Sequence, residues 1–153
     1  MFKKTADNQS VSPSGGWNTK IHAVTAGDPF LKGFILSGGE EHDAPAGRLL
    51  LETLGKQETV VPLLMDLAYA DIKTRFTAWE LCFYAVVPPK TNTVDKWEYD
   101  KELYKKRDEI EHFFCRLKAF RAVFTRYDKL DSIFSASILF TSIIIVLCCV
   151  NTP

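Results

Sequence analysis

Four side chains capable of acid–base or phosphate chemistry fall on one face of a predicted helix in the C-terminal half of the chain. They are Tyr104, Arg107, Glu111 and Lys118. On an ideal helix, with about 100° per residue, they share an arc of roughly 60°. The apolar residues of the same stretch lie on an adjacent arc, so the polar stripe is expected at the edge of the core. A carboxylate flanked by Arg, Lys and Tyr on successive turns can hold a metal ion while its neighbours contact phosphate.

The stripe also fits an ordinary amphipathic helix whose charges pair on the surface, as Arg107 and Glu111 would at i,i+4 spacing. Asp66 favours a functional site instead. It ends a short apolar run, 60–65, that is typical of a buried strand, and it leads directly into a predicted helix. The ends of strands are where α/β sheets present catalytic groups.

The pattern of the four side chains, Y-x2-R-x3-E-x6-K, resembles the signature around the catalytic glutamate of bacterial insertion-sequence transposases of the DDE type. All four positions match. Further blocks resemble the same family in the same order: residues 15–23, 38–43, 64–75 and 116–128. The resemblance covers the chain from about residue 15 to about residue 147.

This resemblance implies an RNase H-like α/β fold, a mixed sheet flanked by helices, with the catalytic domain over residues 17–150 after a flexible lead-in over residues 1–16. It also implies two aspartates and a glutamate that bind two divalent ions, Mg²⁺ or Mn²⁺, for cleavage and transfer of DNA strands. By matching, Asp66 is the second aspartate and Glu111 the glutamate, so both are expected to be catalytic and metal-binding.

The implied partner is DNA at the ends of the insertion sequence, with a possible homo-oligomer and a cytoplasmic, nucleoid-associated location. Six side chains are expected to contact DNA: Tyr104, Arg107 and Lys118 in the signature, and Arg116, Arg121 and Arg126 in a basic stretch around it. For the three arginines of the basic stretch, a solvated helix face is the alternative.

The chain departs from the family at its start. The first aspartate of the triad is expected on a strand upstream of residue 15, central in the sheet between strands 17–25 and 60–65. The chain begins too late to contain that strand; Asp7 lacks a strand pattern around it, and Asp43 is interpreted as a helix N-cap. We therefore expect an interrupted sheet in the C-terminal portion of a transposase. Two carboxylates cannot hold two ions about 4 Å apart as three can, so we expect no activity from the chain alone.

The elements that must position these side chains follow from apolar periodicity. The expected strands are 17–25, 30–36, 60–65 and 83–87, the first two forming a hairpin. The expected helices are 43–54, 71–81, 100–125 and 131–150. Two antiparallel strands followed by alternating helices and strands indicate a mixed sheet.

Composition excludes little. The 153 residues are 46% hydrophobic, with 19 basic and 19 acidic side chains, which argues against a wholly basic nucleic-acid binder. The four cysteines lack zinc-ligand spacing and are interpreted as buried or incidental. Two alternatives stay open: a small tail-anchored membrane protein, because residues 133–150 are uncharged over 18 positions, and a catalytically dead DNA-binding fragment.

Overall fold

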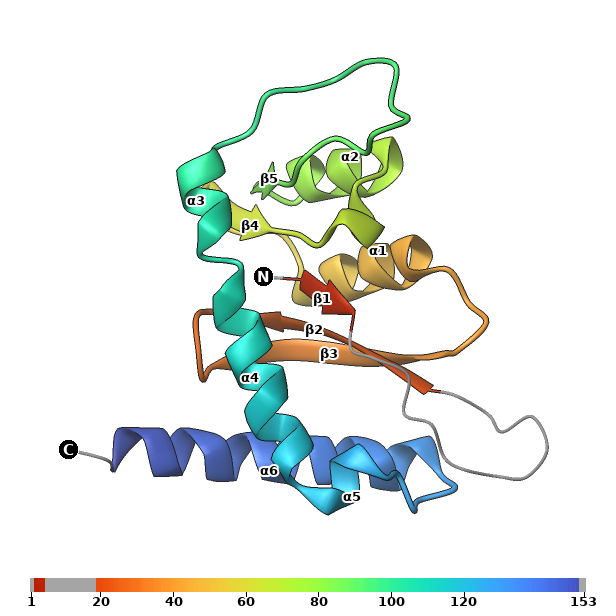
Figure 1. The fold of residues 1–153 in the computed structure, drawn as a ribbon, viewed down its shortest axis with the longest axis vertical. Helices are drawn as coiled ribbons and strands as arrows, with labels where there is room; N and C mark the ends of the chain where they lie inside the picture. Colours follow the sequence, from red (N-terminus) through yellow and green to blue (C-terminus); the bar gives the residue numbers. More distant parts are fainter. Residues whose placement is uncertain (1, 5–18, 152–153) are drawn as a thin grey trace.

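The structure, a computed structural model that describes residues 2–4 and 19–151, is a mixed α/β fold with small sheets flanked by helices (Figure 1). The strands are β1 (Phe2–Lys4), β2 (Thr19–Thr25), β3 (Leu31–Gly38), β4 (Val61–Leu64) and β5 (Phe83–Val86). The helices are α1 (Asp43–Leu54), α2 (Ile72–Glu80), α3 (Lys101–Lys105), α4 (Asp108–Ala119), α5 (Arg121–Phe124) and α6 (Asp131–Val150), with a short 3₁₀ turn, η1 (Leu67–Tyr69), after β4. Apart from β1 and the division of the helix expected over 100–125, the element order matches the expected one. The fold is consistent with an RNase H-like domain whose sheet is interrupted.

The strands form two separate sheets. β2 and β3 pair antiparallel around a turn that uses Gly27 in the left-handed region, with φ of 80°, so the predicted hairpin is confirmed. β4 and β5 pair parallel. Among the described residues no strand joins the two sheets. The gap between β2 and β4 holds a cavity of about 430 Å³ lined by Val24, Thr25 and the four residues of β4.

β1 was not predicted. It lies in the stretch 1–16 that was expected to be a flexible lead-in, and it pairs antiparallel with β2, with Phe2 opposite Val24 and Lys4 opposite His22. In Figure 1 this short strand lies between β2 and β4, yet it hydrogen-bonds only to β2. Three residues therefore occupy part of the place expected for a central strand. The rest of the lead-in, including Asp7, lies outside the described residues.

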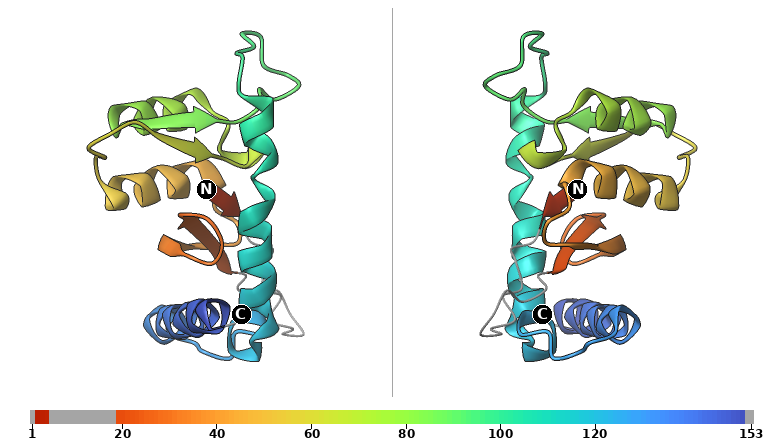
Figure 2. Two further views of the ribbon diagram at one scale, coloured as in Figure 1. Left: turned by 90° about the vertical axis from the view of Figure 1, so that its left-hand side faces the viewer. Right: turned by 90° about the vertical axis from the view of Figure 1, so that its right-hand side faces the viewer.

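The helices cover the two sheets in a stack (Figure 2). Along the stack, α2, the β4–β5 sheet, α1, the β2–β3 hairpin and α6 follow one another, while α3 and α4 run along one side. α1 ends at Gly55, whose φ of 74° lies in the left-handed region that commonly ends a helix. Leu50 and Leu51 of α1 are both fully buried, and each such side chain stabilises the fold by about 1.5–3 kcal/mol.

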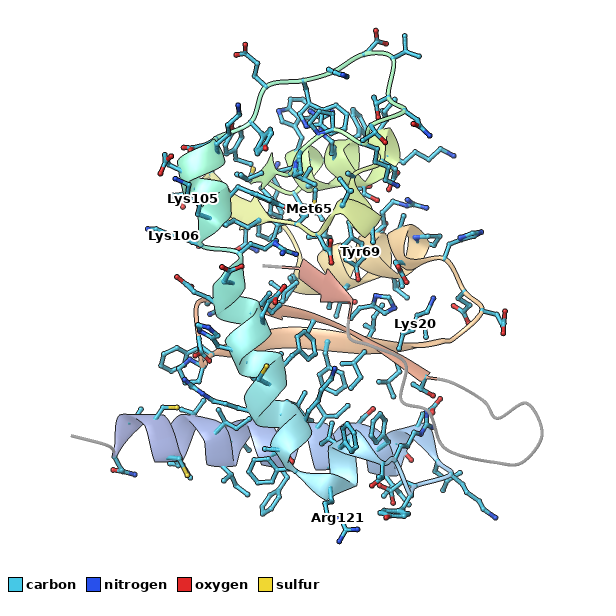
Figure 3. The ribbon with its side chains drawn as sticks, in the orientation of Figure 1. Lys20, Met65, Tyr69, Lys105, Lys106 and Arg121 are labelled. Carbon is cyan, nitrogen blue, oxygen red and sulfur yellow. The ribbon has the colours of Figure 1, made fainter. Side chains whose placement is uncertain are left out.

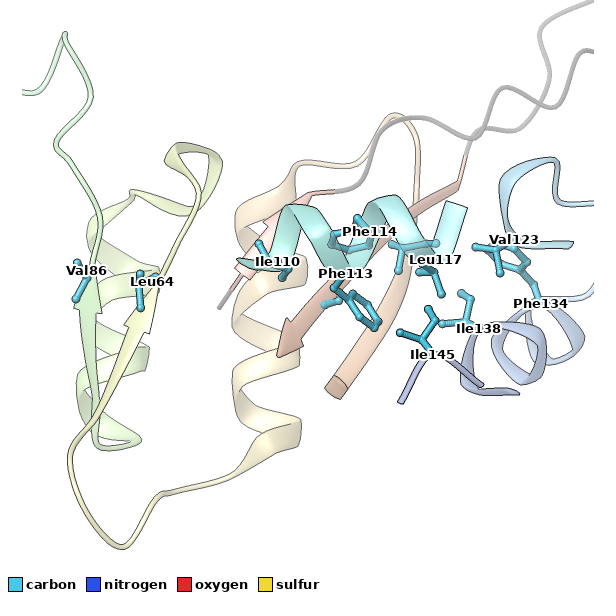
Figure 4. Close-up of a cluster of buried hydrophobic side chains, with 12 residues drawn as sticks. Leu64, Val86, Ile110, Phe113, Phe114, Leu117, Val123, Phe134, Ile138 and Ile145 are labelled. Atoms are coloured by element: carbon cyan, nitrogen blue, oxygen red, sulfur yellow. The ribbon is translucent and has the colours of Figure 1, made fainter. Parts of the chain in front are cut away.

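One buried cluster extends along α4 and connects the β4–β5 sheet to α6 (Figure 4). At one end are Leu64 and Val86; the middle is formed by the apolar face of α4; Ile138 and Ile145 of α6 are at the far end. The α4 side chains Ile110, Phe113, Phe114 and Leu117 are 0–3% exposed. α4 thus has the predicted apolar face. Because this face is buried, the other side chains of α4 lie toward solvent or toward β4.

The prediction of one continuous helix over 100–125 is wrong. The structure has α3, α4 and α5 instead, separated at Lys106–Arg107 and at Phe120. Around the first break the backbone N–H groups of Arg107 and Glu109 each bond to the carbonyl three residues earlier, which is 3₁₀ geometry. At the second break Phe120 is extended, with ψ of 117°. Apolar periodicity continues through both breaks, so it could not reveal them.

Two smaller expectations also change. Asp43 is not the N-cap of α1; His42 precedes the helix, and Asp43 is the first helical residue. Of the two interpretations given to the cysteines, buried or incidental, burial is wrong: Cys115 and Cys148 are exposed, and Cys82 and Cys149 are only half-buried. No described cysteine forms a disulfide.

Candidate active site

Asp66 follows β4 directly and begins the turn that leaves the sheet. Its carboxylate accepts a hydrogen bond from the backbone N–H of Leu67 at 2.6 Å, which caps η1. The preceding Met65 is fully buried, while the Asp66 side chain is 26% exposed. The end of the strand therefore presents a carboxylate at the boundary between core and solvent, as the sequence predicts.

Arg107 lies at the break between α3 and α4 and contacts two carboxylates. Its Nη1 is 3.8 Å from Oδ1 of Asp66, and its Nη2 is 3.3 Å from Oε1 of Glu111. The i,i+4 pair of Arg107 with Glu111 is the one expected from helix spacing. The contact with Asp66 brings in a residue from a different element. Asp66 and Glu111 therefore converge on one guanidinium.

These ion pairs lie at the surface of the fold. Asp66 and Arg107 are each 26% exposed and Glu111 is 39% exposed. Solvent screens pairs of this kind, and each contributes about 0–1 kcal/mol to stability. Their main effect is to hold the carboxylates in place.

Tyr104 completes this part of the site. The Arg107 guanidinium lies 5.7 Å from the centre of the Tyr104 ring, and Tyr99 packs edge-on against the same ring. Burial raises the pKa of Tyr104, the positive charge of Arg107 lowers it, and the charge of Asp66 raises it. The net direction is upward, so the hydroxyl stays neutral and can donate a hydrogen bond.

The described residues do not fit a two-ion site as they stand. Two ions need several oxygen ligands, yet here a guanidinium, itself a cation, contacts both carboxylates. Within residues 2–4 and 19–151 no group of three His, Cys, Asp or Glu side chains is arranged to hold a metal. A positive charge is already present at the place where these carboxylates would meet a metal.

A buried polar network lies behind the turn that follows Asp66. His22 and Tyr69 are fully buried, and their Nδ1 and Oη atoms are 2.6 Å apart; Nε2 of His22 is 2.7 Å from Oγ of Ser37. Burial, followed by the charges of Asp43 and Asp66, raises the pKa of Tyr69 well above its usual value. The network ties η1 to β2 and β3, and so fixes the turn that begins at Asp66.

A buried ion pair adjoins this network. Nζ of Lys20 is 3.2 Å from Oδ1 of Asp43, with side chains only 7% and 10% exposed, and it also donates to the carbonyl of Glu41 at 2.6 Å. Sequence reasoning placed Lys20, His22 and Asp43 in family-like blocks but gave Lys20 and His22 no role. The available signal in the sequence was the placement of Lys20 and His22 at alternate positions of a predicted strand. The structure buries every residue of that strand.

The basic residues expected to contact DNA do not form one face. Arg116 pairs with Asp28 of the hairpin turn at 2.9 Å. Arg126 contacts Thr19 and Asp131, so it links the start of β2 to the start of α6. Arg121, the first residue of α5, points away from the fold in Figure 3. Lys118 is half-buried on α4, about 10 Å along the helix from Glu111.

Comparison with known proteins identifies the family of the chain. The family described as Transposase DDE domain matches residues 14–147, most of the chain. No curated protein and no solved structure matches the chain. The chain belongs to the DDE transposase domain family, whose members act on DNA in transposition with divalent metal ions.

Proposed function

We propose that residues 17–150 form the catalytic domain of an insertion-sequence transposase, in which Asp66 and Glu111 are two of the carboxylates that bind metal. The single observation that carries this proposal is their shared contact with Arg107, at 3.8 Å and 3.3 Å. Asp66 ends a strand and Glu111 lies on a helix, so chain proximity does not account for their meeting. Both carboxylates remain partly exposed, as groups that act on a bound DNA strand must be.

Arg107, Tyr104 and Lys118 act around these carboxylates in the proposal. Arg107 orients Asp66 and Glu111, while the neutral hydroxyl of Tyr104 donates toward a phosphate oxygen. Lys118 lies further along α4 and contacts the DNA backbone. Of the arginines in the basic stretch, exposed Arg121 is the strongest candidate for a phosphate contact; Arg116 and Arg126 already pair with acidic side chains of the fold.

We further propose that the chain does not cleave DNA by itself. The proposed ion is Mg²⁺, or Mn²⁺ in its place. Two carboxylates on either side of a guanidinium leave two ions short of oxygen ligands. The chain would bind DNA in the nucleoid of the cytoplasm, as part of a homo-oligomer, without completing strand cleavage.

The test uses the purified chain with labelled terminal DNA of its element and either Mg²⁺ or Mn²⁺. The expected result is salt-sensitive binding without cleavage. Arg121→Gln should reduce the slope of log affinity against log salt by about 1, because one phosphate contact is lost. Lys96→Gln, in an exposed loop away from the site, is the matched control and should leave the slope unchanged. Robust metal-dependent cleavage by the unmodified chain would show that the inactivity proposal is wrong.

A further inference from the structure

One face of α6 is apolar and exposed along the whole helix. We define the outer stripe as Ile133, Ala136, Phe140, Ile143, Leu147 and Val150. Its five large side chains are 49–67% exposed, and Leu139 beside it is 50% exposed. The residues follow one another at alternating intervals of three and four. This spacing is the one with which a helix packs against another helix through a coiled-coil seam.

The outer stripe does not resemble a face made for water. The opposite face of α6 packs into the fold through Phe134, Ile138 and Ile145, and it also carries the buried hydroxyls of Thr141 and Ser142. The polar side chains of the helix centre thus face inward, while the outer stripe has none. A helix with only one buried face normally shows the reverse distribution.

Charged contacts hold both ends of α6 against the rest of the fold. At its N-terminal end, Asp131 pairs with Arg126, whose guanidinium also lies 4.8 Å from the centre of the Phe134 ring. At its C-terminal end, Nη1 of Arg116 lies 2.9 Å from Sγ of Cys149, and the same guanidinium pairs with Asp28.

These contacts bear on the lipid alternative. α6 is long and apolar enough to cross a membrane, with 28% of its most apolar window buried in the fold. A bilayer around α6 would have to displace α4, α5 and the arginine contacts or bury their charges, each at a cost of several kcal/mol. The surface that covers the outer stripe must therefore cover one face only.

We infer that the outer stripe packs against the outer stripe of a second copy of this chain. Figures 1 and 2 show α6 at one end of the molecule, with the β2–β3 hairpin on one side of it and α4 and α5 alongside it. The stripe carries no charge, so two copies do not repel each other. Its area, about 100 Å² for each large side chain, gives about 500–600 Å² per copy, near the lower limit of specific interfaces.

An interface at this end of the size range is typical of weak association, so we expect a concentration-dependent monomer–dimer equilibrium. The inference stands whether or not the chain cleaves DNA, because it rests on α6 alone. It also accounts for an exposed apolar patch that would otherwise promote aggregation.

The test is sedimentation equilibrium of the full chain from about 1 to about 100 μM, a range in which a weak dimer would form progressively. The mass should rise from 17.3 kDa toward twice that value. Phe140→Glu and, independently, Ile143→Gln should each weaken dimerisation at least tenfold. Both side chains are more than half exposed, so circular dichroism should show an unchanged fold. Val94→Glu, which also replaces an exposed apolar side chain, is the matched control and should dimerise normally.

Three results would overturn the inference. The first is a wild-type chain that stays monomeric at the highest concentration. The second is equal loss of dimer in Val94→Glu, which would make the effect one of charge alone. The third is stable insertion into phosphatidylcholine–phosphatidylglycerol vesicles that resists carbonate washing, which would assign the outer stripe to lipid.

Discussion

The hydrogen bond between His22 and Tyr69 gives a prediction that depends on the buried network behind Asp66. Tyr69→Phe removes only the hydroxyl whose oxygen lies 2.6 Å from Nδ1 of His22. Both side chains are fully buried, so water cannot replace the lost partner. Removal of one partner from such a buried pair costs about 1–3 kcal/mol.

The expected loss is large enough to measure by thermal or urea unfolding. For a chain of this length each kcal/mol lowers the melting temperature by about 2–4 °C, so Tyr69→Phe should lower it by roughly 2–12 °C. The matched control is Tyr127→Phe, because Tyr127 is 72% exposed, and it should change stability by less than about 0.5 kcal/mol.

A double-mutant cycle isolates the bond itself. His22→Phe alone should destabilise the fold, since it also removes the 2.7 Å contact with Ser37. Combined with Tyr69→Phe, it should cost less than the sum of the single changes, with a coupling of about 0.5–3 kcal/mol. Additive effects, or a Tyr69→Phe variant as stable as Tyr127→Phe, would refute the role given to this network.

Three further predictions concern the core and the buried charges. Phe113→Ala should lower the unfolding free energy measured in urea by about 3–5 kcal/mol, because Phe113 is fully buried beside α6. Phe76→Ala, at a 55% exposed site, should change the same free energy far less. Lys20→Met should cost about 3–5 kcal/mol, since it leaves the Asp43 carboxylate buried without its cation, and Lys20→Met/Asp43→Leu should recover part of that loss in the same assay. Burial raises the pKa of Tyr69 above the unfolded value near 10. The contribution of the neutral Tyr69 hydroxyl to stability is therefore present below about pH 10 and is lost as the pH rises further. Between about pH 9 and 11, the unfolding free energy measured in urea should fall less for Tyr69→Phe than for wild type.

Elements specified by local periodicity were predictable from sequence. Alternation gave the β2–β3 hairpin, a short apolar run gave β4, and an uncharged helical stretch gave α6 with the bounds expected, Asp131–Val150. β1 could not be found in this way. Its three residues carry no strand pattern of their own, and their strand geometry comes from pairing with β2, a contact distant in sequence.

Within the candidate site, one contact of Arg107 was also predictable from local spacing and the other was not. The pair of Arg107 with Glu111 follows from helix spacing and was expected, although 3₁₀ hydrogen bonds precede it where a continuous helix was predicted. The contact of Arg107 with Asp66 depends on how α4 packs against β4, which no local pattern specifies. Asp43 illustrates the same limit. Its side chain type suits an N-cap, yet the buried cation of Lys20 determines where its carboxylate lies.

The central claim is that Asp66 and Glu111 meet at one site around Arg107. The most direct test replaces both carboxylates with cysteine in a chain whose four native cysteines have been changed to serine or alanine, and treats it with a short bifunctional thiol reagent. We predict rapid intramolecular cross-linking of Asp66→Cys/Glu111→Cys, because the two native side chains contact the same guanidinium. Asp66→Cys/His112→Cys, whose second position lies one residue further round α4 and is exposed, should cross-link much more slowly. Equal rates for the two pairs, or no cross-link between positions 66 and 111 in the folded chain, would contradict the account.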